Sequence, residues 1–169
     1  MVFGMSLATY TLIHVIISLV GIGSGLIIVF GMLGGKRMDG MTALFLVTTV
    51  LTSVTGFGFP FEHMTPGIIL GILSLVVLAI AIVARYSFRM AGTWRSVYVV
   101  TAVIALYFNC FVLIAQSFQK IPALHALAPK GNEPPFAIAQ GILLLLFIVL
   151  GVMAAKKFHP ASIGVARVA

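Results

Sequence analysis

Long apolar runs dominate the sequence, and short segments rich in glycine, proline and charge separate them. Five runs, about 7–33, 41–59, 67–86, 97–118 and 136–155, are long enough to cross a membrane as helices. About 20 mostly apolar residues span a hydrocarbon core of about 30 Å. The alternation of apolar and polar residues that marks a transmembrane strand does not occur. The pattern therefore predicts an all-α polytopic bundle of five membrane-spanning helices, forming a single domain over residues 1–169.

The segments between the runs hold signals for helix starts and stops. Gly34-Gly35 ends the first run and Pro60 ends the second. Thr65-Pro66 and Pro134-Pro135 predict helix starts, because threonine caps a first turn and proline fits the first helical position. The first run has neither a basic segment before it nor a clear cleavage site, so we expect a retained span rather than a signal peptide. The apolar stretch 121–128 predicts a short interfacial turn.

Composition excludes the soluble and disordered classes. Hydrophobic residues make up 62% of the chain and charged residues 8%, whereas a soluble domain has about 25% charged residues. A disordered chain would be polar and charged. The single cysteine, Cys110, excludes an intramolecular disulfide and a cysteine-built metal site. The chain is thus expected to be an integral membrane protein whose main partner is the lipid bilayer.

Charge is distributed asymmetrically over the expected loops. Lys120 and Lys130 share one side with Glu62 and Glu133. The other side holds Asp39 and the remaining basic residues: Lys36, Arg37, Arg85, Arg89, Arg95, Lys156, Lys157 and Arg167. Because cytoplasmic loops carry the excess of Lys and Arg, we expect the N-terminus outside and the C-terminus in the cytoplasm. Topology and contact with anionic lipids explain the net charge of +7, and no nucleic-acid partner is predicted.

Small residues recur at helical spacing in two of the runs. Gly21 and Gly25 form one GxxxG motif, and Gly67 and Gly71 form another at the start of the third run. Glycines four residues apart lie on one helix face and let backbones approach closely in lipid. Both motifs therefore predict helix–helix packing.

Polar side chains within the runs gather at similar depths. Measured at about 1.5 Å per residue, four of them lie about 6–13 Å below the outer ends of their spans, and a fifth lies near the interface. An unpaired amide or imidazole in hydrocarbon is costly, so these groups should turn toward each other. The expected outer-half cluster is His14, Thr52, Asn109, Gln116 and Gln140. Two interpretations stay open, namely interhelical hydrogen bonds that fix the bundle and a polar pocket near the outer surface.

Little in the sequence indicates catalysis or a cofactor. No acid lies within a run, and no nucleophile motif occurs, so we expect no enzymatic activity. His63, His125, Glu62 and Glu133 share the outer side with His14, but their spacing matches no metal motif. We therefore predict no metal and no cofactor. A quinone site is less demanding, because it needs an apolar slot with one or two hydrogen-bond donors to the carbonyl oxygens, and His14, Asn109 or Gln140 could supply them.

Three stretches resemble a family of small multi-pass inner-membrane proteins encoded in many proteobacteria. They are Asn109-Cys-Phe-Val-Leu-Ile-Ala-Gln-Ser-Phe-Gln-Lys-Ile-Pro-Ala-Leu124, Glu133-Pro-Pro-Phe-Ala-Ile-Ala-Gln140 and Thr52-Ser-Val-Thr-Gly-Phe-Gly-Phe-Pro60. The likeness runs over most of the chain. It implies a location in the bacterial inner membrane, and it implies no activity and no role for any residue.

The leading functional expectation is a non-enzymatic accessory or assembly subunit that acts through its helix faces. Such a subunit would contact other membrane proteins or form a homo-oligomer, because almost no part of the chain lies outside the bilayer. One alternative is a small-molecule or ion transporter that works as an oligomer, since five spans enclose little pore. The other is a redox protein with a quinone or metal site in the outer half of the membrane.

Overall fold

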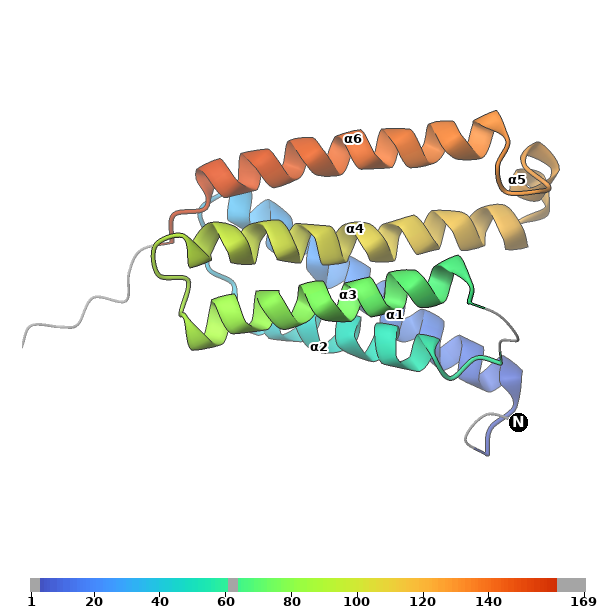
Figure 1. The fold of residues 1–169 in the computed structure, drawn as a ribbon, viewed down its shortest axis with the longest axis horizontal. Coiled ribbons are helices and arrows are strands. Elements are labelled where there is room, and N and C mark those ends of the chain that lie inside the picture. Colours follow the sequence, from blue (N-terminus) through green and yellow to red (C-terminus); the bar gives the residue numbers. More distant parts are fainter. Residues whose placement is uncertain (1–3, 61–63, 161–169) are drawn as a thin grey trace, which may run out of the picture.

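The structure, a computed structural model, describes residues 4–60 and 64–160. These residues form an all-α bundle (Figure 1). The described residues contain no strand. Five helices are long and apolar enough to cross a membrane, which confirms the predicted five-span bundle. The elements are α1 (Leu7–Leu33), α2 (Asp39–Gly56), α3 (Pro66–Ile82) with the π-helical turn η1 (Val83–Ser87), α4 (Trp94–Lys120), α5 (Pro122–Leu127) and α6 (Pro134–Lys157).

Local sequence explains most helix boundaries. The Thr65 hydroxyl accepts a hydrogen bond from the Ile68 backbone N–H at 3.4 Å, and Pro66 opens α3. The second span departs from expectation, because α2 ends at Gly56 and not at 59. The Gly58 N–H donates to the carbonyl of Thr55 in a turn, and two glycines within three residues are poor helix formers.

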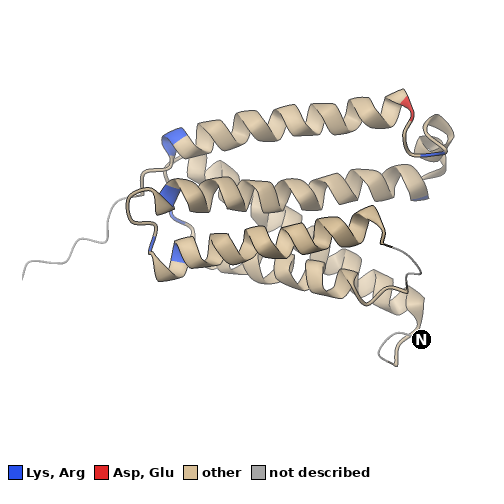
Figure 2. Cartoon of the chain, viewed as in Figure 1, with Lys and Arg blue, Asp and Glu red and all other residues tan. Residues whose placement is uncertain are grey.

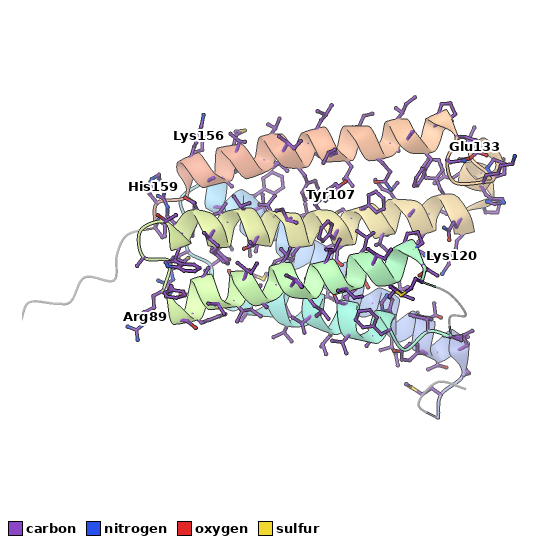
Figure 3. The ribbon with its side chains drawn as sticks, viewed as in Figure 1. Arg89, Tyr107, Lys120, Glu133, Lys156 and His159 are labelled. Atoms are coloured by element: carbon purple, nitrogen blue, oxygen red, sulfur yellow. The ribbon has the colours of Figure 1, made fainter. Side chains whose placement is uncertain are left out.

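The long helices pack around α4. This helix contacts α1, α3 and α6, while α1 also packs along α2. Of the five candidate spans α4 is the most buried and α6 the least. Figure 3 shows Tyr107 between α4 and α6, where its ring centroid lies 5.7 Å from that of Phe147. The apolar outer face of α6 is therefore left to lipid or to another protein.

The charged residues lie at the two ends of the bundle (Figure 2). We call them the basic end and the α5 end. Arg89, Lys156 and His159 lie at the basic end, and Lys120 and Glu133 lie at the α5 end (Figure 3). Arg167 and Glu62 fall outside the described residues. In the part of the chain that the structure describes, the loops therefore lie at the two ends in the grouping that the sequence predicted.

A buried arginine links three elements at the basic end through an ion pair and a cation–π contact. The Arg85 side chain is 2% exposed, and its Nη2 donates to Oδ1 of Asp39. Arg37 Nε donates to the same oxygen at 2.8 Å. The Arg85 guanidinium also lies 5.0 Å from the ring centroid of Tyr98 on α4, in cation–π geometry. No local pattern in the sequence predicts this ion pair, because Asp39 and Arg85 are 46 positions apart.

The first GxxxG motif lies where α1 meets α2 and α4. A Cβ on Gly25 would be 2.6 Å from Leu106 Cδ1 and 2.8 Å from the Phe45 ring. A Cβ on Gly21 would be 3.3 Å from the hydroxyls of both Thr48 and Thr49. At both glycines the absence of a side chain allows close approach, as small residues do in membrane bundles.

The second motif divides between two environments. A Cβ on Gly71 would be 3.1 Å from Phe57 Cζ, so this glycine accommodates the ring from the turn after α2. The nearest atom to a Cβ on Gly67 is the Thr65 hydroxyl at 3.7 Å, in the same segment. Gly71 thus lies at a packing contact between elements and Gly67 does not.

Candidate functional site

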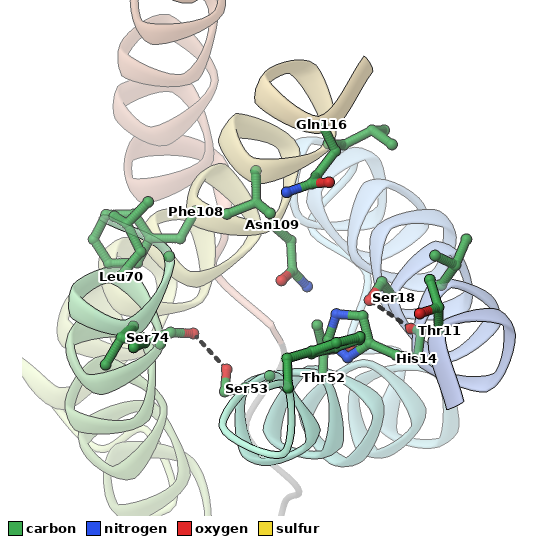
Figure 4. Close-up of a pocket in the computed structure, with 18 of the residues that line it drawn as sticks. Thr11, His14, Ser18, Thr52, Ser53, Leu70, Ser74, Phe108, Asn109 and Gln116 are labelled. Carbon is green, nitrogen blue, oxygen red and sulfur yellow. Dashed lines mark hydrogen bonds between the residues drawn. The ribbon is translucent and has the colours of Figure 1, made fainter. Parts of the chain in front are cut away.

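A cavity of about 570 Å³ opens at the α5 end between α1, α2, α3 and α4 (Figure 4). The floor of the cavity lies next to the close approach of α1 to α4 at Gly21 and Gly25. Gly25 packs on Leu106, and a Cβ on Gly21 would be 3.5 Å from Asn109 Nδ2. Nearer the α5 end, the facing residues of both helices line the cavity instead. Its volume lies within the range of about 300–1,000 Å³ that is typical of small-molecule sites.

Four of the five polar residues expected to converge line this cavity. His14 comes from α1, Thr52 from α2, and Asn109 and Gln116 from α4. Gln140 does not line it, because α6 packs on another side of α4. The Gln140 Nε2 donates instead to the Phe111 carbonyl at 3.1 Å, which is an interhelical hydrogen bond.

Three of the cavity hydroxyls donate their protons within their own helix. Thr11 donates to the Leu7 carbonyl at 2.8 Å, Ser18 to the His14 carbonyl at 2.7 Å and Thr52 to the Thr48 carbonyl at 2.9 Å. Such back-bonding is common for Ser and Thr in helices. These hydroxyls therefore offer a ligand their oxygen lone pairs and no donor.

The hydrogen bonds around His14 assign its tautomer. His14 Nδ1 lies 2.8 Å from the Thr55 hydroxyl, and that hydroxyl donates to the Leu51 carbonyl at 2.7 Å. Because the hydroxyl has one proton, we assign the Nδ1–H of His14 as donor to the Thr55 oxygen. In the neutral ring, Nε2 is then a hydrogen-bond acceptor. The ring also packs edge-on against Phe59, with centroids 5.1 Å apart.

Asn109 brings an unpartnered donor to the cavity. The residue is 9% exposed, and its Nδ2 has no hydrogen-bond partner among the described residues. Figure 4 shows the amide pointing into the cavity toward His14. Leaving a buried donor without a partner costs about 1–3 kcal/mol. The Thr49 hydroxyl, close to Gly21, also has no hydrogen-bond partner in the described part of the chain.

The cavity carries little charge. Lys120 alone among the described lining residues has a fixed charge, and it is exposed. No Asp or Glu side chain contributes to the described lining. The cavity therefore favours an uncharged ligand over a cation.

Two of the four weak metal candidates fall within the described part of the chain. His63 and Glu62 lie outside the described residues, and His125 is exposed on α5. Backbone N–H groups of Lys130 and Asn132 donate to the Glu133 carboxylate at 3.0 and 3.1 Å, which holds the pKa of Glu133 below its usual value. Within residues 4–60 and 64–160, no three His, Cys, Asp or Glu side chains lie close enough to hold a metal ion.

Aromatic lining residues were not anticipated from the sequence. Phe57 and Phe59 come from the turn after α2, and Phe108 comes from α4. The signal in the sequence was the Gly56-Phe-Gly-Phe-Pro60 segment, because its glycines favour the end of a helix and place the two phenylalanines in a turn.

No protein-family model, no curated protein and no solved structure matches the chain.

Proposed function

We propose that the protein is a non-enzymatic accessory subunit located in the bacterial inner membrane, and that it binds a small, uncharged, lipid-soluble molecule in this cavity. The observation that carries the proposal is Asn109 Nδ2, which has no hydrogen-bond partner among the described residues; the residue is nine-tenths buried and its amide points into the cavity. Buried polar groups in folded proteins are normally paired. A ligand with an acceptor oxygen would supply the missing partner.

Exposed apolar residues at the cavity edge support entry of the ligand from the bilayer. Val15 and Leu19 on α1 are 39% and 49% exposed, and Leu113 on α4 is 41% exposed. All three also line the cavity. Apolar side chains that contact both the cavity and the surrounding lipid form a route for a hydrophobic molecule between α1 and α4.

The packing below the cavity favours binding over transport through a single chain. Phe45 and Leu106 are almost fully buried and meet α1 at Gly25. This layer separates the cavity from the basic end. A binding subunit also agrees with the expected accessory role, for which the exposed face of α6 offers a surface to lipid or to another subunit.

The charge distribution supports a topology with the N-terminus outside and the cavity in the outer half of the membrane. A reporter fused after Ala169 should be active in the cytoplasm, and a reporter inserted at Asn132 should be active in the periplasm. Enzymatic fusion reporters of the two compartments measure this. The opposite pattern would place the cavity in the inner half.

Filling the cavity tests the proposed function. Ser18 lines the cavity, so Ser18→Phe should place a ring where the ligand binds. Val20, on the same helix, is 40% exposed and is not among the lining residues, so Val20→Phe is the matched control. We expect solvent extracts of the wild type and of Val20→Phe, purified in mild detergent, to contain a small molecule in about equimolar amount. The Ser18→Phe extract should lack it, as mass spectrometry would show. Equal contents in all three proteins, including none, would contradict the proposal.

A further inference from the structure

We infer that the ligand is a lipid-soluble quinone or its hydroquinone, bound by Asn109, with His14 as a second hydrogen-bond partner of the hydroquinone. The inference rests on the proposed function and narrows its ligand class. It concerns binding and includes no electron transfer by this chain.

The two polar groups that face each other across the cavity differ in hydrogen-bonding character. Asn109 Nδ2 on α4 is a donor without a partner in the described structure. His14 Nε2 on α1 is an acceptor, because Nδ1 is committed to Thr55. A quinone carbonyl accepts from Asn109. A hydroquinone hydroxyl donates to His14 and still presents lone pairs to Asn109. Asn109 can therefore bind either form of the ring, whereas His14 adds a hydrogen bond only to the hydroquinone.

The rest of the lining suits a flat ring with an apolar tail. Phe57, Phe59 and Phe108 line the cavity, and aromatic rings pack favourably in offset or edge-to-face contact with another ring. The exposed edge at Leu19 and Leu113 leaves space for a tail to continue into lipid. The fixed charge of Lys120 lies on an exposed side chain, so an uncharged ring need not face a buried ion.

Ligand-induced thermal stabilisation of the full chain in detergent tests the inference. We would use three probes at equal ratios to detergent. Decylubiquinone has the ring, the oxygens and a tail; decylbenzene lacks the oxygens; 1-decanol has a hydroxyl and lacks the ring. A ligand that binds only the folded state at about 100-fold its Kd should raise the Tm of a chain of this size by about 5–10 °C. We expect that rise with decylubiquinone and no comparable rise with the other two probes.

Matched asparagine variants locate the site. Asn109→Leu removes the donor and should weaken decylubiquinone binding at least tenfold. Asn132→Leu makes the same change in the loop before α6 and should leave binding unchanged. Ser18→Phe is a second blocking variant and should lose the Tm rise even if Asn109→Leu folds poorly. Retention of the full rise in folded Asn109→Leu, or in Ser18→Phe, would overturn the inference.

The probes also separate this inference from the proposed function. An equal Tm rise with 1-decanol, lost in Ser18→Phe, would overturn the quinone class and leave the binding cavity in place. No rise with any probe, together with equal small-molecule contents in wild type and Ser18→Phe, would overturn both proposals.

Discussion

Replacing Gly25 by alanine should lower the thermal stability of the protein in detergent, whereas Gly23→Ala should not. A Cβ at Gly25 would lie 2.6 Å from Leu106 Cδ1 and 2.8 Å from the Phe45 ring. Both neighbours are at most 1% exposed, so neither can move without disturbing the core. Overpacking of this kind costs about 1–3 kcal/mol.

Gly23 is the matched control because a Cβ there meets nothing within 4 Å. Both variants gain the helix propensity of alanine over glycine, about 1 kcal/mol. The difference between the two variants therefore isolates the packing term at the contact of α1 with α2 and α4. Thermal unfolding followed by circular dichroism measures it. Equal Tm values for the two variants would show that α1 does not pack closely at Gly25.

Asp39→Asn should destabilise the basic end by about 1–3 kcal/mol, between the values for exposed and buried ion pairs. The Asp39 side chain is 65% exposed, but its partner Arg85 is 2% exposed. Removing the carboxylate charge would leave the buried guanidinium in contact with the Tyr98 ring and Met90 Sδ, and without a counter-ion among the described residues. Asparagine keeps the size of the side chain and one acceptor oxygen, so the change tests the charge itself.

Two further variants bracket this effect. Glu133→Gln makes the same carboxylate-to-amide change at the α5 end, where the partners are backbone N–H groups of an exposed loop. Arg37→Gln removes the second cation from Asp39 and leaves the Arg85 pair intact. We expect both to change the Tm less than Asp39→Asn does. A Tm change for Asp39→Asn no larger than for Glu133→Gln would mean that the Arg85 pair contributes little to stability.

Local physical rules made much of this fold readable in the sequence. A hydrocarbon layer obliges each spanning segment to satisfy its own backbone, so a long apolar run predicts a helix regardless of its neighbours. The start of α3 followed from Thr65-Pro66 alone, and α1 has the bounds that its apolar run indicated. The spacing of Gly21 and Gly25 also placed them on one face, because side-chain direction repeats along a helix.

Tertiary structure decided which faces meet. The sequence predicts similar depths for Asn109 and Gln140. The Gln140 amide nevertheless donates a hydrogen bond to the Phe111 carbonyl on another side of α4. Depth is fixed by position along a helix, whereas partnership depends on how each helix is rotated and which neighbour it packs against. The pair of Asp39 and Arg85 joins residues 46 positions apart, and no local pattern contains that distance.

The cavity itself is also a tertiary property. The sequence predicted polar groups from several spans but not the space between them. That space lies between α1, α2, α3 and α4 beyond the close approach at Gly21 and Gly25, and the turn after α2 brings Phe57 and Phe59 to the cavity wall. The sequence alone determined which side chains lie at this depth. Only the packing of four helices decided that Asn109 Nδ2 faces the cavity without a hydrogen-bond partner among the described residues, because pairing depends on every neighbour at once.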